Sequence, residues 1–224
     1  MHVGLIMRKD LVTVPPDTSL VKARDLINEK LIDHLLVVDK DGKLVGIVSD
    51  RDLKQAWASP ATTLSAHELN YLLKQLNVEA IMVKKIMTVT PGTTIERAGR
   101  IMQENRISAL PVMENEKLVG IITTTDVMGV LLDAIGIDGE SARFVVLVED
   151  RVGMIAEVSR ILKEEQINIR SLVSWPEKTY PGIYQIVLRV SAANGEKAIS
   201  TLTRAGFKVL TEYVDDLSPY LPGQ

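Results

Sequence analysis

Two acidic residues stand at matching places in two copies of one short stretch. The stretch LVGIVSDRD ends at Asp52, and LVGIITTTD ends at Asp126. In each copy a hydroxyl residue stands three positions earlier, at Ser49 and at Thr123. This spacing is typical of a capping box, in which hydroxyl and carboxylate satisfy free N–H groups at a helix start. The same groups could hold a ligand, since a carboxylate accepts from a sugar diol and helix-start N–H groups can meet a phosphate.

A glycine interrupts each apolar run that leads to these carboxylates. Gly46 and Gly120 lie within predicted strands, where glycine packs little and weakens the strand unless another group approaches closely. A ligand that reaches the strand would explain both glycines, whereas capping alone does not. The sequence leaves two interpretations open for Asp52 and Asp126, namely helix capping and ligand binding.

The doubled stretch belongs to a longer internal repeat. Segments that begin LIDHLL and RISALP are 75 positions apart, while Asp52 and Asp126 are 74 positions apart. The missing residue falls in a polar turn, DKDGK against ENEK, where a deletion disturbs little structure. Upstream, the Ile-Met pair that ends at Met7 is matched with the pair that ends at Met87.

Each copy predicts the same small unit. A short extended piece and a Pro-containing turn precede a helix whose apolar residues recur at helical spacing. Two β-rich runs follow, joined in the first copy by Asp41-Gly42, which is a hairpin signal, and a second helix closes the unit. In the second copy, Thr93 with Glu96 predicts a capping box at the first helix start. The predicted order is β-α-β-β-α, twice.

This combination of motif, order and repeat resembles the paired cystathionine β-synthase (CBS) domains, over about residues 1–135. In that family two units pair about a pseudo-twofold axis, and the clefts between them bind adenosyl ligands such as AMP, ADP, ATP or S-adenosylmethionine. The resemblance implies that Asp52 and Asp126 accept from the ribose, with Ser49 and Thr123 near the phosphate and ribose. It also implies that the base is bordered by Met7, His34, Met87, Ala109 and Pro111.

Basic side chains that would meet a phosphate differ between the copies. Arg51 lies at the second helix start of the first copy, where the second copy has Thr125. Arg106 lies before the first β-rich run of the second copy, where the first copy has Leu31. We therefore expect two unequal sites, one of which could hold a neutral arm such as methionine.

From residue 144 the pattern changes to β-α-β-β-α-β, the order of a ferredoxin-like domain. The stretch EDRVGMIAEVSRIL resembles the start of an ACT domain, a regulatory module that often binds amino acids at its first strand-to-helix turn. Of the family pattern D-x-P-G-x-L, Asp150 and Gly153 are present, whereas Val152 replaces the proline. The resemblance implies that Asp150, Gly153, Met154 and Asn168 border any ligand, although Gly153 is equally explained as a helix-entry glycine.

The predicted fold class is α/β (α+β), a tandem CBS pair followed by a ferredoxin-like ACT domain. The expected parts are a first repeat at 1–58, a connecting helix at 59–80, a second repeat at 81–135, a linker at 136–143, the ACT domain at 144–213 and a tail at 214–224. This combination resembles the acetoin utilization proteins of the AcuB type, which suggests carbon-source regulation. Because an ACT sheet leaves an exposed edge strand, a homodimer is expected.

Bulk composition excludes several function classes. A net charge of −3 gives no electrostatic footprint for nucleic acid. The absence of Cys excludes disulfides and thiolate metal sites, and no apolar run approaches the roughly 18 residues of a membrane span. The three histidines have no metal-ligand spacing, and no P-loop or G-x-S-x-G motif occurs.

From these features we expect a cytoplasmic regulatory protein that senses an adenosyl ligand, and an amino acid or small metabolite at the ACT domain. It would act on an unidentified partner protein, with no metal and no catalytic cofactor. The alternatives are an interaction module without a ligand and an enzyme.

Overall fold

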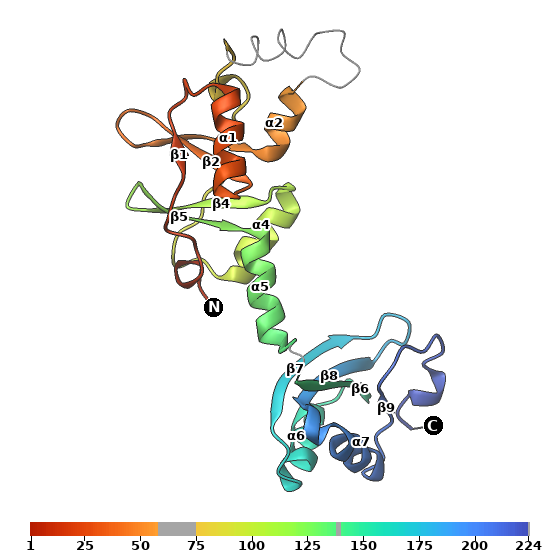
Figure 1. Ribbon diagram of the computed structural model, residues 1–224. Helices are drawn as coiled ribbons and strands as arrows, with labels where there is room; N and C mark the ends of the chain where they lie inside the picture. Colours follow the sequence, from red (N-terminus) through yellow and green to blue (C-terminus); the bar gives the residue numbers. More distant parts are fainter. Residues whose placement is uncertain (58–74, 138–139, 224) are drawn as a thin grey trace. The chain divides into compact units, whose positions relative to one another are not determined.

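The computed structural model describes residues 1–57, 75–137 and 140–223 (Figure 1). The chain forms two compact units, Met1–Met128 and Gly129–Gln224, and each has its own hydrophobic core. The predicted connecting helix at 59–80 falls largely on residues 58–74, which lie outside the described residues.

The first repeat has the predicted β-α-β-β-α order. Its elements are β1 (Thr13–Val14), α1 (Leu20–Lys30), β2 (His34–Val38), β3 (Leu44–Ser49) and α2 (Asp50–Ala56). In the sheet β1 runs parallel to β2, and β2 runs antiparallel to β3. Helix α1 buries Leu20, Ala23 and Ile27, the face that helical spacing predicts, and packs it against the sheet.

The second repeat follows the same plan with α4 (Ile95–Asn105), β4 (Ala109–Glu114), β5 (Lys117–Thr123) and α5 (Thr124–Ile135). In place of a first strand, Val89 makes a single parallel bridge to Val112. The predicted cap of α4 is one residue off. Thr94 is the N-cap and accepts from the Arg97 N–H at 3.3 Å, whereas the hydroxyl of Thr93 accepts from the Thr90 N–H at 3.1 Å in the preceding turn.

The turn between the paired strands carries the missing residue, as predicted. The first hairpin closes at Val38 and Leu44, with Gly42 at φ 78° in the loop. The second closes more tightly at Glu114 and Lys117, and the two residues between them both adopt positive φ. The shorter turn thus explains why the repeat offset falls from 75 to 74 while both sheets keep their register.

The segment that leads into each repeat packs against the other repeat. We name residues 1–8 and 77–83 the first and second lead-in. The first lead-in, with η1 (Val3–Leu5), bonds to the second repeat, and its Arg8 pairs with Ile121 of β5. The second lead-in, with η2 (Val78–Ala80), bonds to the first repeat, and its Val83 pairs with Ile47 of β3. The two repeats are interlocked within one unit.

The second unit is ferredoxin-like, as predicted. Its elements are β6 (Ser141–Glu149), α6 (Met154–Glu164), β7 (Ile169–Pro176), β8 (Ile183–Ser191), α7 (Gly195–Arg204) and β9 (Val209–Leu210). The sheet order is β7-β8-β6-β9, and both helices pack on one face over a core that includes Phe144, Leu162 and Leu188. Strand β6 begins at Ser141, three residues before the predicted start of the domain.

The C-terminal segment covers the opposite face of this sheet. Alternate residues of β6, such as Val145 and Leu147, point away from the helices and form a second apolar cluster. Residues predicted to be a tail pack against this cluster, namely Val214, Leu217, Tyr220 and Leu221. Residues 214–221 are thus part of the packed domain.

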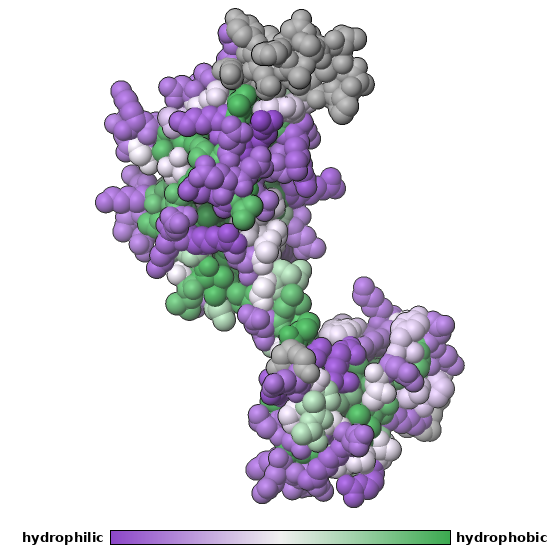
Figure 2. Space-filling model, viewed as in Figure 1, coloured by the Kyte–Doolittle hydropathy of each residue, from purple (hydrophilic) through white to green (hydrophobic). Residues whose placement is uncertain are grey.

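The surface is mainly hydrophilic on the face seen in Figure 2, with apolar surface along α5. Met128, Leu131 and Leu132 of this helix are exposed. Among the described residues, no helix combines the length and the apolar character needed to cross a membrane.

Candidate functional site

The first motif site consists of Ser49 and Asp52, where β3 ends and α2 begins. Asp52 Oδ2 accepts from the Ser49 N–H at 2.8 Å and from the Ser49 hydroxyl at 2.6 Å. Ser49 Oγ in turn accepts from the Asp52 N–H at 3.2 Å. This is a complete capping box, so the structural role that the sequence predicts for these residues is present.

The second motif site consists of Thr123 and Asp126, where β5 ends and α5 begins. Asp126 Oδ2 accepts from the Thr123 N–H at 2.8 Å and the Thr123 hydroxyl at 2.6 Å, and Thr123 Oγ1 accepts from the Asp126 N–H at 3.2 Å. These distances repeat those of the first site, so the two boxes have the same geometry.

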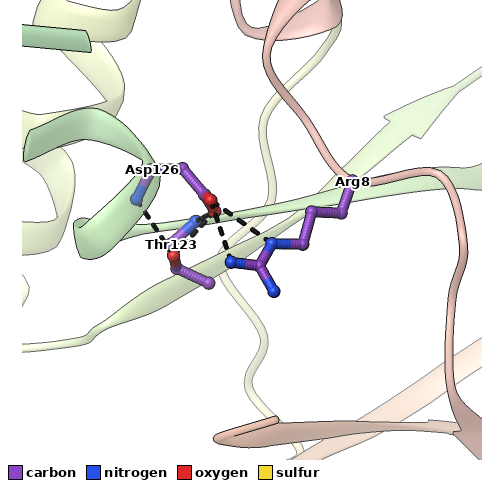
Figure 3. Close-up of polar contacts among 3 residues, drawn as sticks. All are labelled: Arg8, Thr123 and Asp126. Atoms are coloured by element: carbon purple, nitrogen blue, oxygen red, sulfur yellow. Dashed lines mark hydrogen bonds and ion pairs between the residues drawn. The ribbon is translucent and has the colours of Figure 1, made fainter. Parts of the chain in front are cut away.

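The two sites differ at the remaining carboxylate oxygen. Arg8 donates from Nε and Nη2 to Asp126 Oδ1, at 3.3 Å each (Figure 3). Across the described ranges, no hydrogen bond or ion pair reaches Asp52 Oδ1. The lead-in residue that corresponds to Arg8 at the first site is Val83, because each pairs with the residue after a strand glycine.

Methionine side chains of the lead-ins fill the space above the strand glycines. A Cβ added at Gly46 would lie 2.8 Å from Met82 Cγ, and one at Gly120 would lie 2.9 Å from Met7 Cγ, with the sulfur atoms closer still. Packing within the protein thus explains both glycines without a ligand. The sequence feature that favoured binding over capping has a structural origin.

The same contacts correct the match between the lead-ins. Met82, and not Met87, is the counterpart of Met7, since Met82 meets Gly46 as Met7 meets Gly120. Met82 lies 75 positions after Met7, which is the offset of the rest of the repeat. Met87 lies beyond the lead-in with 40% of its surface exposed. The prediction went wrong because the Ile-Met pair occurs twice within seven residues.

His34 joins the two repeats beside the first motif site. Its Nε2 lies 2.8 Å from Ser108 Oγ, directly before β4. Burial lowers the pKa of His34 below its ordinary value of 6.5, and the carboxylates of Asp33 and Asp52 oppose that shift. Ala109 is the counterpart of His34 in the second repeat, so that repeat has no titrating ring at this position.

The other predicted residues are spread over the first unit. Arg51 is exposed in the first turn of α2. Arg106 is also exposed and ends α4 in a left-handed conformation at φ 55°, as Leu31 ends α1 at φ 51°. Ala109 and Pro111 are buried in β4, and the Pro111 carbonyl accepts from the Val89 N–H at 3.1 Å.

Arg8 and Ser108 are the polar residues of this region that sequence reasoning missed. Arg8 directly follows Met7, and a correct match of the lead-ins would have set it against Val83. Ser108 directly precedes a β-rich run and carries no motif of its own. Both make their contacts across more than 70 positions of chain.

In the ACT-like unit Asp150, Gly153 and Met154 lie at the turn between β6 and α6, whereas Asn168 lies between α6 and β7, near the start of β6. Gly153 caps α6 at φ 94°, a left-handed conformation that favours glycine. Asp150 and Asn168 are exposed, whereas Met154 is buried in the core. The helix-entry explanation of Gly153 is consistent with this geometry.

A cavity of about 270 Å³ lies beside that turn. Of the four predicted residues, Met154 alone lines it. Its other charged and aromatic lining residues are Glu149, Arg151, Glu157, Phe207, Lys208 and Tyr220. Arg151 is held by Glu157 at 3.1 Å.

Family models match most of the chain. The model described as CBS domain matches residues 3–59 and 78–133, and the model described as ACT domain matches residues 142–207. A CBS domain-containing protein of Dictyostelium discoideum is 32% identical over 128 residues, which are 57% of this chain and 88% of that protein.

Some similar proteins carry enzyme names but match over the CBS region alone. A homoserine O-acetyltransferase of Methanohalobium evestigatum is 34% identical over 127 residues, which are 56% of this chain and 23% of that enzyme. The chain therefore spans less than a quarter of the length of this relative.

Solved structures are also similar to this chain. A CBS-domain containing protein from Agrobacterium tumefaciens is 30% identical, with a TM-score of 0.51 over 58% of this chain and 99% of that one. A candidate acetoin utilization protein (AcuB) from Vibrio cholerae is 28% identical, with a TM-score of 0.49 over 59% and 91%, and a link to acetoin use stays a prediction. The chain belongs to the CBS-domain proteins, with a tandem CBS pair followed by a C-terminal ACT domain.

Proposed function

We propose that this protein is a non-catalytic regulator that binds an adenosyl ligand at its motif sites. The observation that carries the proposal is the free oxygen of Asp52. Its Oδ2 is occupied by the capping box, while Oδ1 has no hydrogen-bond partner among the described residues. A fixed carboxylate with one free oxygen at a helix start can accept from a ribose diol.

Family membership supports the same class of ligand, because the CBS pair resembles modules that bind AMP, ADP, ATP or S-adenosylmethionine. In the proposal, Ser49 and Thr123 lie near the phosphate and ribose, and Arg51 and Arg106 supply positive charge. The base is bordered by Met7, His34, Ala109 and Pro111, with Met82 in the place first given to Met87.

At the ACT domain we propose a small-metabolite site in the cavity beside α6. An amino acid fits the chemistry of its lining, which offers both carboxylates and the cations Arg151 and Lys208. The earlier candidates Asp150 and Gly153 would border its entrance, whereas Asn168 lies near the start of β6, away from this cavity. We also propose that the protein is a cytoplasmic homodimer. It would act on a regulated partner protein and have a role in carbon-source use.

A second candidate function is an interaction module that binds no adenosyl ligand. It is favoured by the methionines that fill the space above Gly46 and Gly120. With those glycines explained, both the glycines and the capping residues of the motif sites have a structural role.

Isothermal titration calorimetry with AMP, ADP, ATP, S-adenosylmethionine and GMP separates the two candidates. We expect at least one adenosyl compound to bind, GMP not to bind, and the Asp52→Asn variant to lose the binding at the first motif site. A ligand at about 100 times its dissociation constant should stabilise the fold by about 2.7 kcal/mol, which a thermal-shift assay detects.

The control variant is Gln55→Gly at an exposed position of α2. It should destabilise the helix by about 1 kcal/mol and leaves the capping residues unchanged. It should melt lower and bind as the wild type does. If Asp52→Asn behaves like this control, the Asp52 carboxylate is a cap alone. If the wild-type protein binds no adenosyl compound, the interaction-module function stands.

A further inference from the structure

We propose that Arg8 makes the second motif site selective for adenosyl ligands that carry a phosphate, while the first motif site also accepts neutral ones. This inference rests on the proposed function, because it assumes that adenosyl ligands bind at both sites. It assigns a ligand class to each site and gives a binding role to a residue outside the capping motif.

Arg8 occupies the oxygen that a ribose needs. Asp126 Oδ2 is held by Thr123, and Asp126 Oδ1 accepts from both Nε and Nη2 of Arg8. The side chain of Asp126 is 13% exposed, so the carboxylate has little other surface to offer. A ribose diol can reach it once Arg8 moves aside.

Arg8 can move because its own side chain is 54% exposed. An ion pair with one partner exposed to water contributes little to stability, so its release costs little. The released guanidinium needs a new anion. A phosphate on the ligand supplies it, with the bidentate geometry that guanidinium groups favour.

A neutral nucleoside would break the same ion pair but offers Arg8 no new anionic partner. The second site should therefore bind adenosine worse than AMP, even though both present the same base and diol. The guanidinium acts as an internal competitor for Asp126 that a phosphate draws away.

The first site lacks this competitor. Val83 stands at the position of Arg8, and Asp52 Oδ1 is free among the described residues. Adenosine can bind there without breaking an ion pair. Arg51, exposed one position before Asp52, leaves a phosphate acceptable too, so the first site should discriminate less.

Calorimetry on single-site variants of the full chain tests this. In Asp52→Ala the second site remains, and AMP should bind at least about tenfold more tightly than adenosine. Adding Arg8→Met should bring the two affinities within about threefold, with AMP weakened and adenosine strengthened. Asp52→Ser replaces Asp52→Ala if the latter fails to fold.

The reciprocal variant, Val83→Arg, should give the first site the selectivity for phosphate. In Asp126→Ala the first site remains, and Val83→Arg should widen the ratio of AMP to adenosine affinity there. Val83 is 47% exposed, so the longer side chain has room. Arg8→Met that weakens AMP and adenosine equally, or changes neither, overturns the inference and leaves the proposed function intact. If wild-type protein binds no adenosyl compound, the proposed function falls, and this inference falls with it.

Discussion

The two motif sites have the same cap and different neighbours. In both, a hydroxyl and a carboxylate three positions apart close the start of a helix, with matching distances. The carboxylate of Asp126 also holds Arg8, whereas that of Asp52 has an oxygen to spare among the described residues. A short motif fixes the geometry of a carboxylate, but a segment far away in the chain decides what that carboxylate is free to bind.

The lead-ins show how this difference arises. Where they meet the strand glycines both lead-ins carry methionine, Met7 and Met82, and both methionines fill the space above the glycine. At the next position they diverge, to Arg8 and Val83. The methionine is the same in both lead-ins because it packs against a glycine, whereas the next residue is charged in one lead-in and apolar in the other.

The largest effect should come from disturbing the shared packing. Gly46→Val and Gly120→Val each push a side chain into the methionine above, and overpacking of this kind costs about 1–3 kcal/mol. Because the two contacts are alike, the two variants should lose similar amounts of unfolding free energy. Urea denaturation monitored by circular dichroism measures both.

Second substitutions provide the control for that experiment. Met82→Ala should partly rescue Gly46→Val but not Gly120→Val, and Met7→Ala should do the reverse. Rescue by the wrong methionine would mean that the lead-ins do not cross between repeats as described.

The internal repeat and its elements could be predicted because they depend on local features. Apolar spacing gave the buried face of α1, and a polar turn located the missing residue between β4 and β5. The crossed lead-ins could not be predicted in this way, because periodicity carries no information about which distant segment meets a strand. The wrong choice of Met87 has that cause, since two Ile-Met pairs suit the local pattern and a tertiary contact selects Met82.

The site residues likewise fall into those that local sequence predicts and those that depend on distant contacts. Ser49, Asp52, Thr123 and Asp126 form the predicted boxes because capping is an interaction over three residues. Arg8 forms an ion pair with Asp126, 118 positions away in the chain, and neither residue type nor spacing predicts such a pair. The packed role of the C-terminal segment escaped for a related reason, since its partners are on β6 and β8.

Removing the capping carboxylates should give the next largest effect. Asp52→Ala and Asp126→Ala should each lower the free energy of unfolding by about 1 kcal/mol, since each leaves the backbone N–H and the hydroxyl of the N-cap residue, Ser49 or Thr123, without their acceptor. The loss at Asp126 should be slightly greater because its ion pair to Arg8 is lost as well. Chemical denaturation in parallel measures the difference. A gap above about 1 kcal/mol would contradict the view that this ion pair is weak.

The first site should also respond to pH through His34, whereas the second has Ala109 there. Burial lowers the pKa of His34 in the folded protein, so the unfolded chain binds the proton more readily. The fold should lose stability as pH falls through and below 6.5 and be insensitive above it. In His34→Asn the fall in unfolding free energy between about pH 8 and about pH 5.5 should be smaller.

Ser108→Ala is the matched variant for that measurement. It removes the hydrogen-bond partner of His34 and keeps the ring, so the dependence on pH should persist. A flat profile in Ser108→Ala would make the hydrogen bond, and not burial, the source of the pH effect. An unchanged profile in His34→Asn would assign the effect to another group.

The smallest effect on stability should come from Arg8 itself. Arg8→Ala breaks an ion pair whose basic partner is more than half exposed, so the free energy of unfolding should fall by less than about 1 kcal/mol and the difference should shrink in high salt. Thermal and urea denaturation at low and high salt measure it, with Val83→Ala as the uncharged control at the corresponding position. A small value is what a binding role requires, because a ligand can release Arg8 from Asp126 at low cost. A loss above about 2 kcal/mol would instead make the pair a structural contact too strong for a phosphate to open, and the two sites would then differ in stability and not in ligand.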